Sequence, residues 1–242
     1  GIILIGLGTI INAGAIVVGG LLGLLLKNAL PQRISDTLTK AIGICVLFIG
    51  LSGALQNMFT IEDGALSVGG TMMTIFSFIG GSILGGALDL EGRLERFGVW
   101  LRKRAGADGD SGFLNAFLTA SFTVCIGAMA VVGAINDGLF GDISLLVTKS
   151  ILDAIIIMVM AATMGKGCIF SAIPVALFQG LVTLFARFLQ PIMTAQATSN
   201  LALTGSILVF CVGVNLIWDQ QRLKVANMLP TLIFAVALAF VL

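Results

Sequence analysis

The sequence predicts an all-α protein that crosses a membrane about eight times. Of its 242 residues, 58% are hydrophobic and only 10% are charged, and the mean hydropathy is +1.11. Ordinary soluble domains carry about 25% charged residues. The apolar residues also fall into long runs near the length of about 20 residues that a helix needs to cross a bilayer. Membrane lipid is therefore the first partner that we expect.

Eight apolar runs qualify as spans, and short polar segments separate them. The second and eighth are short, and the fourth is interrupted by small and polar residues, so re-entrant geometry stays open for these three. The expected spans are about 2–26, 41–58, 67–89, 112–135, 143–164, 168–189, 195–218 and 226–242.

Two connecting segments are expected at the membrane surface instead of across it. Residues 31–40 form a short polar stretch. Residues 90–105 place Leu94, Phe97 and Leu101 on one face of a helix and five basic residues around the other. This pattern predicts an amphipathic helix that lies on an anionic lipid surface.

Weak internal similarity suggests repeats within a single polytopic domain, 1–242. Residues 118–121 (LTAS) resemble residues 203–206 (LTGS). We predict a first repeat at about 1–105, a second at about 112–190 and a C-terminal helix pair at about 195–242. Three spans in a repeat would invert the second copy, as in many transporters. Chance similarity between helices rich in Gly and Ala is the alternative.

Charge and glycine spacing bear on orientation and assembly. Lys and Arg gather in the odd-numbered loops, which the positive-inside rule places in the cytoplasm, with both termini outside.

Glycines pair at four-residue spacing, as Gly19 with Gly23 and Gly81 with Gly85. Such pairs permit close helix approach. They fit packing within one chain or a homo-oligomer interface equally well.

Several functional classes are disfavoured. The chain has no His, no phosphate-binding loop and no hydrolase motif, so we do not expect an enzyme. Its four cysteines form no CxxC pair, and we expect no metal site or cofactor. A net charge of +1 gives no reason to expect nucleic-acid binding.

Asp153 is the most informative residue, because it lies in the middle of the apolar run 143–164. A carboxylate at that depth costs roughly 3 kcal/mol or more and marks a candidate functional site. Lys149 precedes it by four residues and shares its helix face. The two could form a structural ion pair, or a cation or proton site in which Lys149 is a competing counter-ion.

Polar residues in other spans are candidates for a solute or ion site. The amides Asn12, Gln179 and Asn215 lie inside apolar runs, where they serve either interhelical hydrogen bonding or coordination. Asn136-Asp137-Gly138 follows span four directly, and this sequence favours a tight exterior turn. If span four unwinds, Asn136 and Asp137 would line an outer vestibule instead. The polar residues within that span are Thr119, Ser121 and Thr123.

The segments 6–20 (GLGTIINAGAIVVGG), 213–217 (GVNLI) and 224–230 (KVANMLP) resemble the YqgA/YdfK-like family of uncharacterised bacterial inner-membrane proteins. The resemblance spans essentially the whole chain. It implies a multi-pass protein of the bacterial cytoplasmic membrane, in a family grouped with transport proteins, and no established substrate.

We therefore predict a transporter of a small solute or ion, with Asp153 binding a cation or proton. Two alternatives remain. The chain could be a membrane scaffold whose amphipathic helix recruits lipid or a partner, or it could be a passive ion channel.

Overall fold

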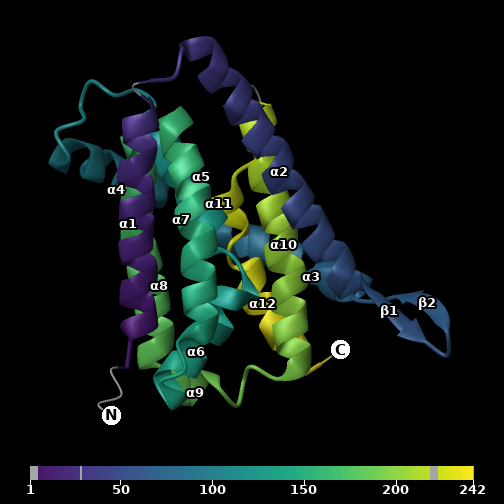
Figure 1. The fold of residues 1–242 in the computed structure, drawn as a ribbon. Coiled ribbons are helices and arrows are strands. Elements are labelled where there is room, and N and C mark those ends of the chain that lie inside the picture. Colours follow the sequence, from purple (N-terminus) through teal and green to yellow (C-terminus); the bar gives the residue numbers. More distant parts are fainter. Residues whose placement is uncertain (1–4, 28, 219–222, 242) are drawn as a thin grey trace. The chain divides into compact units, whose positions relative to one another are not determined.

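The computed structural model describes residues 5–27, 29–218 and 223–241 (Figure 1). These residues are mostly helical, apart from an antiparallel hairpin of β1 (Phe59–Glu62) and β2 (Ala65–Val68). Among the described residues, five helices are long and apolar enough to cross a membrane, or up to seven if each of two bent helix pairs is one span. The predicted all-α membrane fold is confirmed, whereas the count of eight spans stays a prediction.

The chain divides into two compact units that interleave along the sequence. Unit 1 takes Gly1–Ile42, Leu94–Cys125 and Met129–Gln190, and unit 2 takes Gly43–Arg93, Ile126–Ala128 and Pro191–Leu242. Each unit draws on residues from more than one of the predicted segments. The inverted repeat itself stays a prediction.

Unit 1 is a bundle in which α1 packs along α7 and α8, and α5 packs along α7, α8 and a short 3₁₀ helix, η1. α4 begins in unit 2 and continues into unit 1. The helices of this unit are α1 (Leu7–Lys27), α4 (Leu90–Arg104), α5 (Phe113–Cys125), α6 (Ala128–Phe140), α7 (Ser144–Met164), η1 (Lys166–Ser171), α8 (Ala172–Leu184) and α9 (Ala186–Leu189).

The helix α1 buries its small and polar side and exposes its large apolar side chains. Asn12, Gly19 and Gly23 face inward, whereas Val18 and Leu25 are exposed. In water this arrangement would be unfavourable, because an extended apolar surface would be hydrated. In lipid it is favourable, since small residues let helix backbones approach closely. The pattern supports lipid contact along α1.

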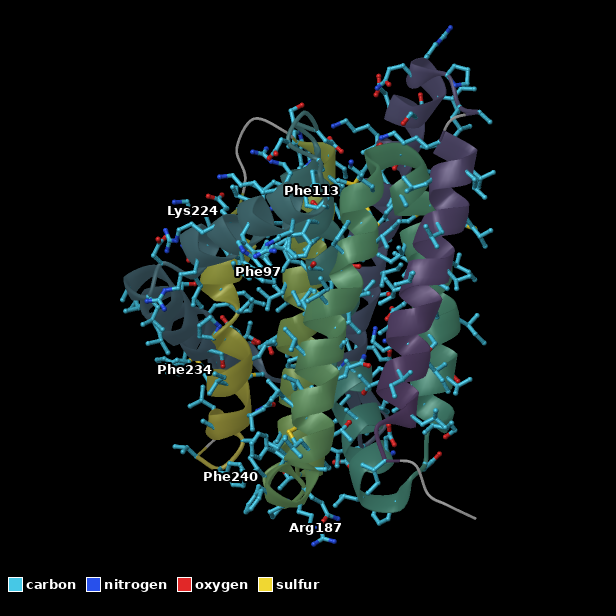
Figure 2. The ribbon with its side chains drawn as sticks, turned by 90° about the vertical axis from the view of Figure 1, so that its left-hand side faces the viewer. Phe97, Phe113, Arg187, Lys224, Phe234 and Phe240 are labelled. Atoms are coloured by element: carbon cyan, nitrogen blue, oxygen red, sulfur yellow. The ribbon has the colours of Figure 1, made fainter. Side chains whose placement is uncertain are left out.

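Unit 2 contains most of α2, the hairpin, and four further helices. In this unit α3 packs against α11 and α12, which also contact α10. Figure 2 shows Lys224 at the start of the α11–α12 segment and Phe240 at its end. The helices are α2 (Gln32–Met58, which begins in unit 1), α3 (Thr71–Ala87), α10 (Ala195–Ile217), α11 (Val225–Met228) and α12 (Thr231–Leu238).

Both glycine pairs make close contacts within the chain. A Cβ at Gly81 would meet Thr231, and one at Gly85 would meet the Asn227 carbonyl group. Asn227 is further fixed because its Oδ1 accepts a hydrogen bond from the Glu91 backbone N–H at 2.9 Å. Of the two interpretations left open by the spacing, the structure supports intrachain packing.

One local expectation requires correction. Residues 31–40 are not a separate surface segment, because α2 starts at Gln32 and runs for 27 residues. Pro31 suits the start of this helix, where its missing N–H is not needed. The predicted span 168–189 largely coincides with a candidate span at Lys166–Leu184, which η1 and α8 form together, and α9 follows it. The hairpin was not predicted from sequence, whereas the predicted helix at 90–105 is present as α4.

Candidate functional site

Asp153 and Lys149 form an ion pair on the inner side of α7. Their exposed fractions are 3% and 7%. Lys149 Nζ donates to Asp153 Oδ1 at 2.8 Å and to Oδ2 at 2.7 Å. Because an unpaired buried charge costs several kcal/mol, each group makes the burial of the other tolerable.

The Lys149 ammonium also reaches a break between two helices. Its Nζ donates to the backbone carbonyl of Val124 at 2.8 Å. α5 ends at Cys125, α6 begins at Ala128, and the two helices are bent by 63°. Gly127 provides the break, since its φ of 149° is rarely accessible to other residues. The predicted interruption of span four therefore exists, at residues 126–127.

The position of Lys149 at the end of α5 has an electrostatic reason. The last four carbonyl groups of a helix have no intrahelical partner. They also carry the negative end of the helix dipole, which favours a cation. Lys149 thus donates hydrogen bonds to two acceptors at once, the Val124 carbonyl group and the Asp153 carboxylate.

Asn12 brings a third helix to the same carboxylate. Its Nδ2 donates to Asp153 Oδ2 at 3.1 Å, and its side chain is fully buried. The approach of α1 depends on Gly19, because a Cβ there would meet the Ala154 carbonyl group. The three predicted residues Asn12, Lys149 and Asp153 therefore form one hydrogen-bonded cluster.

Asp137 is fully buried at the N-terminus of α1. Its two carboxylate oxygens accept hydrogen bonds from the backbone N–H groups of Gly6 at 3.1 Å and Gly8 at 3.0 Å. The expected turn at residues 136–138 is wrong, because α6 continues to Phe140. The N-terminal N–H groups and the positive end of α1 compensate this charge, so Asp137 can remain helical and buried.

Asp137→Ala is expected to lower the free energy of unfolding by about 1–2 kcal/mol, because two N–H groups of α1 lose their acceptor. Thermal unfolding in detergent would measure the loss. Asp108→Ala, at an exposed position, is the control and should have little effect. Equal stability of the two variants would contradict the capping role.

Asp142 lies outside the spanning helices, between α6 and α7. Its Oδ1 accepts from the Ser144 hydroxyl group at 2.7 Å and from the Ser144 backbone N–H at 3.0 Å. The hydroxyl bond, followed by the backbone bond, holds the pKa of Asp142 below its ordinary value. The bonds therefore stabilise the start of α7 above the ordinary carboxyl pKa and lose this effect as pH falls through the lowered value.

The other predicted residues of unit 1 differ in their partners. The hydroxyl group of Thr119 bonds Asn115 at 3.3 Å, and that of Thr123 bonds the Thr119 carbonyl group at 2.8 Å, so both are engaged on their own helix. Ser121 and Gln179 are buried, and their side-chain polar atoms have no hydrogen-bond partner in the described part of the chain. Asn136 is half-buried in α6.

Asn215 has a structural partner in unit 2. It lies in the last turn of α10, where its Nδ2 donates to the Leu223 carbonyl group at 2.9 Å and its Oδ1 accepts from the Leu223 N–H at 2.8 Å. These two bonds fix Leu223 beside the last turn of α10. Asn12, which was predicted to share a site with Asn215, belongs to unit 1.

Sequence reasoning missed three polar groups of unit 1. The Val124 carbonyl group gives no side-chain signal, whereas Thr9 and Thr183 do: Thr9 lies three residues before Asn12, and Thr183 lies four after Gln179. Helical periodicity places each on the face of its amide neighbour. Within the described residues, no group of three or more His, Cys, Asp or Glu side chains is arranged to hold a metal ion.

Comparison with known proteins places the chain in a family. Residues 7–240 match the model described as "Protein of unknown function (DUF554)". The chain belongs to this family. It is 27% identical over 235 residues to the "Uncharacterized membrane protein YdfK" of Bacillus subtilis (strain 168), covering 97% of this chain and 96% of that protein.

A second relative has similar coverage. The chain is 26% identical over 240 residues to the "Uncharacterized protein YqgA" of Escherichia coli (strain K12), covering 96% of each chain. No solved structure matches. The family resemblance expected from the sequence is therefore confirmed.

Proposed function

We propose that this protein is a multi-pass transporter of a small solute or ion in the bacterial cytoplasmic membrane. The observation that carries the proposal is the position of Lys149, which joins the Asp153 carboxylate to the broken end of α5. Broken helices whose ends face a charged group are a recurrent feature of transporter binding sites.

In this proposal the cluster carries the coupling step. Lys149 is the built-in cation of the site, and it bonds both the carboxylate and the Val124 carbonyl group. A proton or metal cation that binds Asp153 would compete with Lys149 and release it from the carboxylate. Because Lys149 also holds the end of α5, its release would favour a different arrangement of α5 and α6.

The remaining predictions complete this proposal. Odd-numbered loops would face the cytoplasm and both termini would lie outside. Eight spans would be present, and the chain would act without enzymatic activity, as a homo-oligomer.

The rival proposal is a scaffold, and the observed α4 favours it, because Arg93, Lys103 and Arg104 are exposed along this helix. Anionic lipid is the partner that such a surface would bind.

A ligand screen tests the transporter proposal. The thermal stability of wild type and Asp153→Asn would be measured against Na⁺, K⁺, Mg²⁺, pH and a metabolite panel. A ligand at one hundred times its Kd stabilises the native state by about 2.7 kcal/mol, or roughly 5–10 °C in a chain of this length.

We expect one ligand to shift wild type and to lose its effect in Asp153→Asn. Asp142→Asn is the matched control, since Asp142 lies near the same helix but bonds Ser144, and it should keep the shift. A shift retained in Asp153→Asn would contradict a site at Asp153. No shift in any protein, with Asp153→Asn merely less stable, would favour the scaffold.

A further inference from the structure

The packing of unit 1 fixes the alignment of α1 and α8. At one end, Asp137 of α6 bonds Gly8 of α1, and a Cβ at the adjacent Gly138 would meet the Thr183 carbonyl group of α8. At the other end, a Cβ at Gly20 would meet Ile169 in η1. The two helices therefore run antiparallel.

This alignment places polar residues of the two helices at matching levels. Thr9 follows Gly8 directly, so it lies near the level of Thr183. Interpolating between the two ends brings Asn12 to the level of Gln179. Asn12 in turn bonds Asp153. The two helices thus carry buried polar side chains at two matching levels, and the second level includes Asn12, which bonds the ion pair. We refer to Thr9, Thr183, Gln179 and Asn12 as the polar column.

The polar atoms of this column lack partners among the described residues. They are Thr9 Oγ1, Asn12 Oδ1, Thr183 Oγ1 and both amide atoms of Gln179. All four side chains are at most 6% exposed. Such atoms cost free energy unless something hydrogen-bonds them.

Two other buried threonines satisfy their hydroxyl groups on their own helices. Thr204 is also fully buried, but its hydroxyl group donates to the Asn200 carbonyl group at 2.8 Å. Thr163 likewise bonds carbonyl groups of its own helix. Thr231 in unit 2 and Ser121 in α5 also have a buried hydroxyl group without a partner. What distinguishes Thr9 and Thr183 is that each shares a helix face with an amide, Asn12 or Gln179, that also has an unpaired polar atom.

The unpaired polar atoms include both hydrogen-bond donors and acceptors, and this limits which ligand can satisfy all of them. Gln179 offers both a donor and an acceptor, Asn12 offers an acceptor, and each threonine hydroxyl group can do either. A bare cation would leave the Gln179 Nε2 unpaired, and an anion would leave the amide oxygens unpaired. Water satisfies both kinds of group, and buried polar sites are its usual location.

We propose that Thr9, Thr183, Gln179 and Asn12 line a hydrated path by which a small monovalent cation reaches Asp153 from the end of unit 1 where α1 begins. The inference rests on the proposed function, because Asp153 is the destination of the path. The charged groups that face it are Asp137 at its outer end and the Lys149–Asp153 pair at its inner end. One turn beyond Gln179, Val175 belongs to an apolar cluster with Ile16, which closes the path.

Cysteine accessibility to Ag⁺ tests the path in proteoliposomes of the full chain. Single cysteines would replace Thr183, Gln179 or Val175 in a protein whose Cys45, Cys125, Cys168 and Cys211 are replaced with alanine. We expect Thr183→Cys and Gln179→Cys to react at least ten times faster than Val175→Cys. The control has the same helix and the same burial, since Val175 is fully buried.

Equal rates at the three positions would overturn the path. Because Gln179→Cys could disturb folding, Thr204→Cys gives a second reference for a buried threonine, and it should react as slowly as Val175→Cys. If it reacts as fast as Thr183→Cys, the path is also overturned. Protection of Thr183→Cys by Na⁺, relative to choline, identifies sodium as the cation, and fast reaction without protection excludes sodium.

The path and the proposed function fail separately. Fast reaction at Thr183→Cys together with a ligand shift that persists in Asp153→Asn would retain the hydrated path and reject the Asp153 site. Slow reaction together with a shift lost in Asp153→Asn would retain the site and reject this path to it.

Discussion

Lys149→Met is expected to lower the free energy of unfolding by about 3–5 kcal/mol, the usual cost of leaving a buried charge without its partner. The substitution removes both bonds to Asp153 and the bond to the Val124 carbonyl group. Methionine is similar in length to lysine, so the loss reports charge and hydrogen bonding more than volume. Thermal unfolding in detergent, checked by size-exclusion chromatography, would measure it.

The double variant Lys149→Met/Asp153→Asn is the decisive comparison. Neutralising both residues removes the unpaired charge, so we expect most of the lost stability to return. Lys103→Met, at an exposed position of α4, should change stability little. A double variant no more stable than Lys149→Met would mean that the Val124 bond, not the ion pair, accounts for the loss.

The same variants separate structure from function. If the pair is only structural, the double variant would recover ligand-dependent stabilisation together with stability. If Asp153 binds the coupling cation, the double variant would be folded and still insensitive to the ligand. This contrast addresses the two interpretations that the sequence leaves open.

Local spacing predicted only part of the cluster. Lys149 and Asp153 are four residues apart, so helical periodicity alone indicates that they meet. The bond from Asn12 joins residues 141 positions apart and depends on the register of α1 against α7. The Val124 carbonyl group belongs to the backbone, so no residue type signals it. The partners Asn12 and Val124 could therefore be identified only from the packing of α1 against α7 and from the backbone geometry at the end of α5.

The turn predicted at residues 136–138 failed for a related reason. Asn-Asp-Gly has a strong local preference for turns, but α6 continues through it. The N–H groups of Gly6 and Gly8 bond the Asp137 carboxylate, and these partners lie about 130 positions away in sequence. A distant helix terminus thus overrode a local preference.

Gly23→Leu is expected to have the second large effect, because α1 and α7 are in direct backbone contact there. A Cβ at Gly23 would meet the Met158 carbonyl group and would lie 2.9 Å from the Ala161 Cβ. Neither neighbour can move without shifting a helix backbone. Overpacking of this kind costs about 1–3 kcal/mol or more, and larger side chains demand larger shifts.

The shift should also reach the ion pair. Moving α1 away from α7 would lengthen the bond from Asn12 to Asp153, which is 3.1 Å. We therefore expect Gly23→Leu to lose ligand-dependent stabilisation as well as thermal stability, whereas Gly23→Ala should show a smaller loss of both. Comparing wild type, Gly23→Ala and Gly23→Leu would show how strongly ligand binding at Asp153 depends on the close packing of α1 against α7.

Gly14 offers a matched control on the same helix. It is exposed, and a Cβ there would meet nothing within 4 Å. Gly14→Leu is expected to be neutral or slightly stabilising, since leucine favours a helix by up to about 1 kcal/mol over glycine. Equal losses at Gly14 and Gly23 would show that α1 does not tolerate leucine in general, and would contradict a specific contact with α7. A loss at Gly23 alone supports close packing as the support of the Asp153 site.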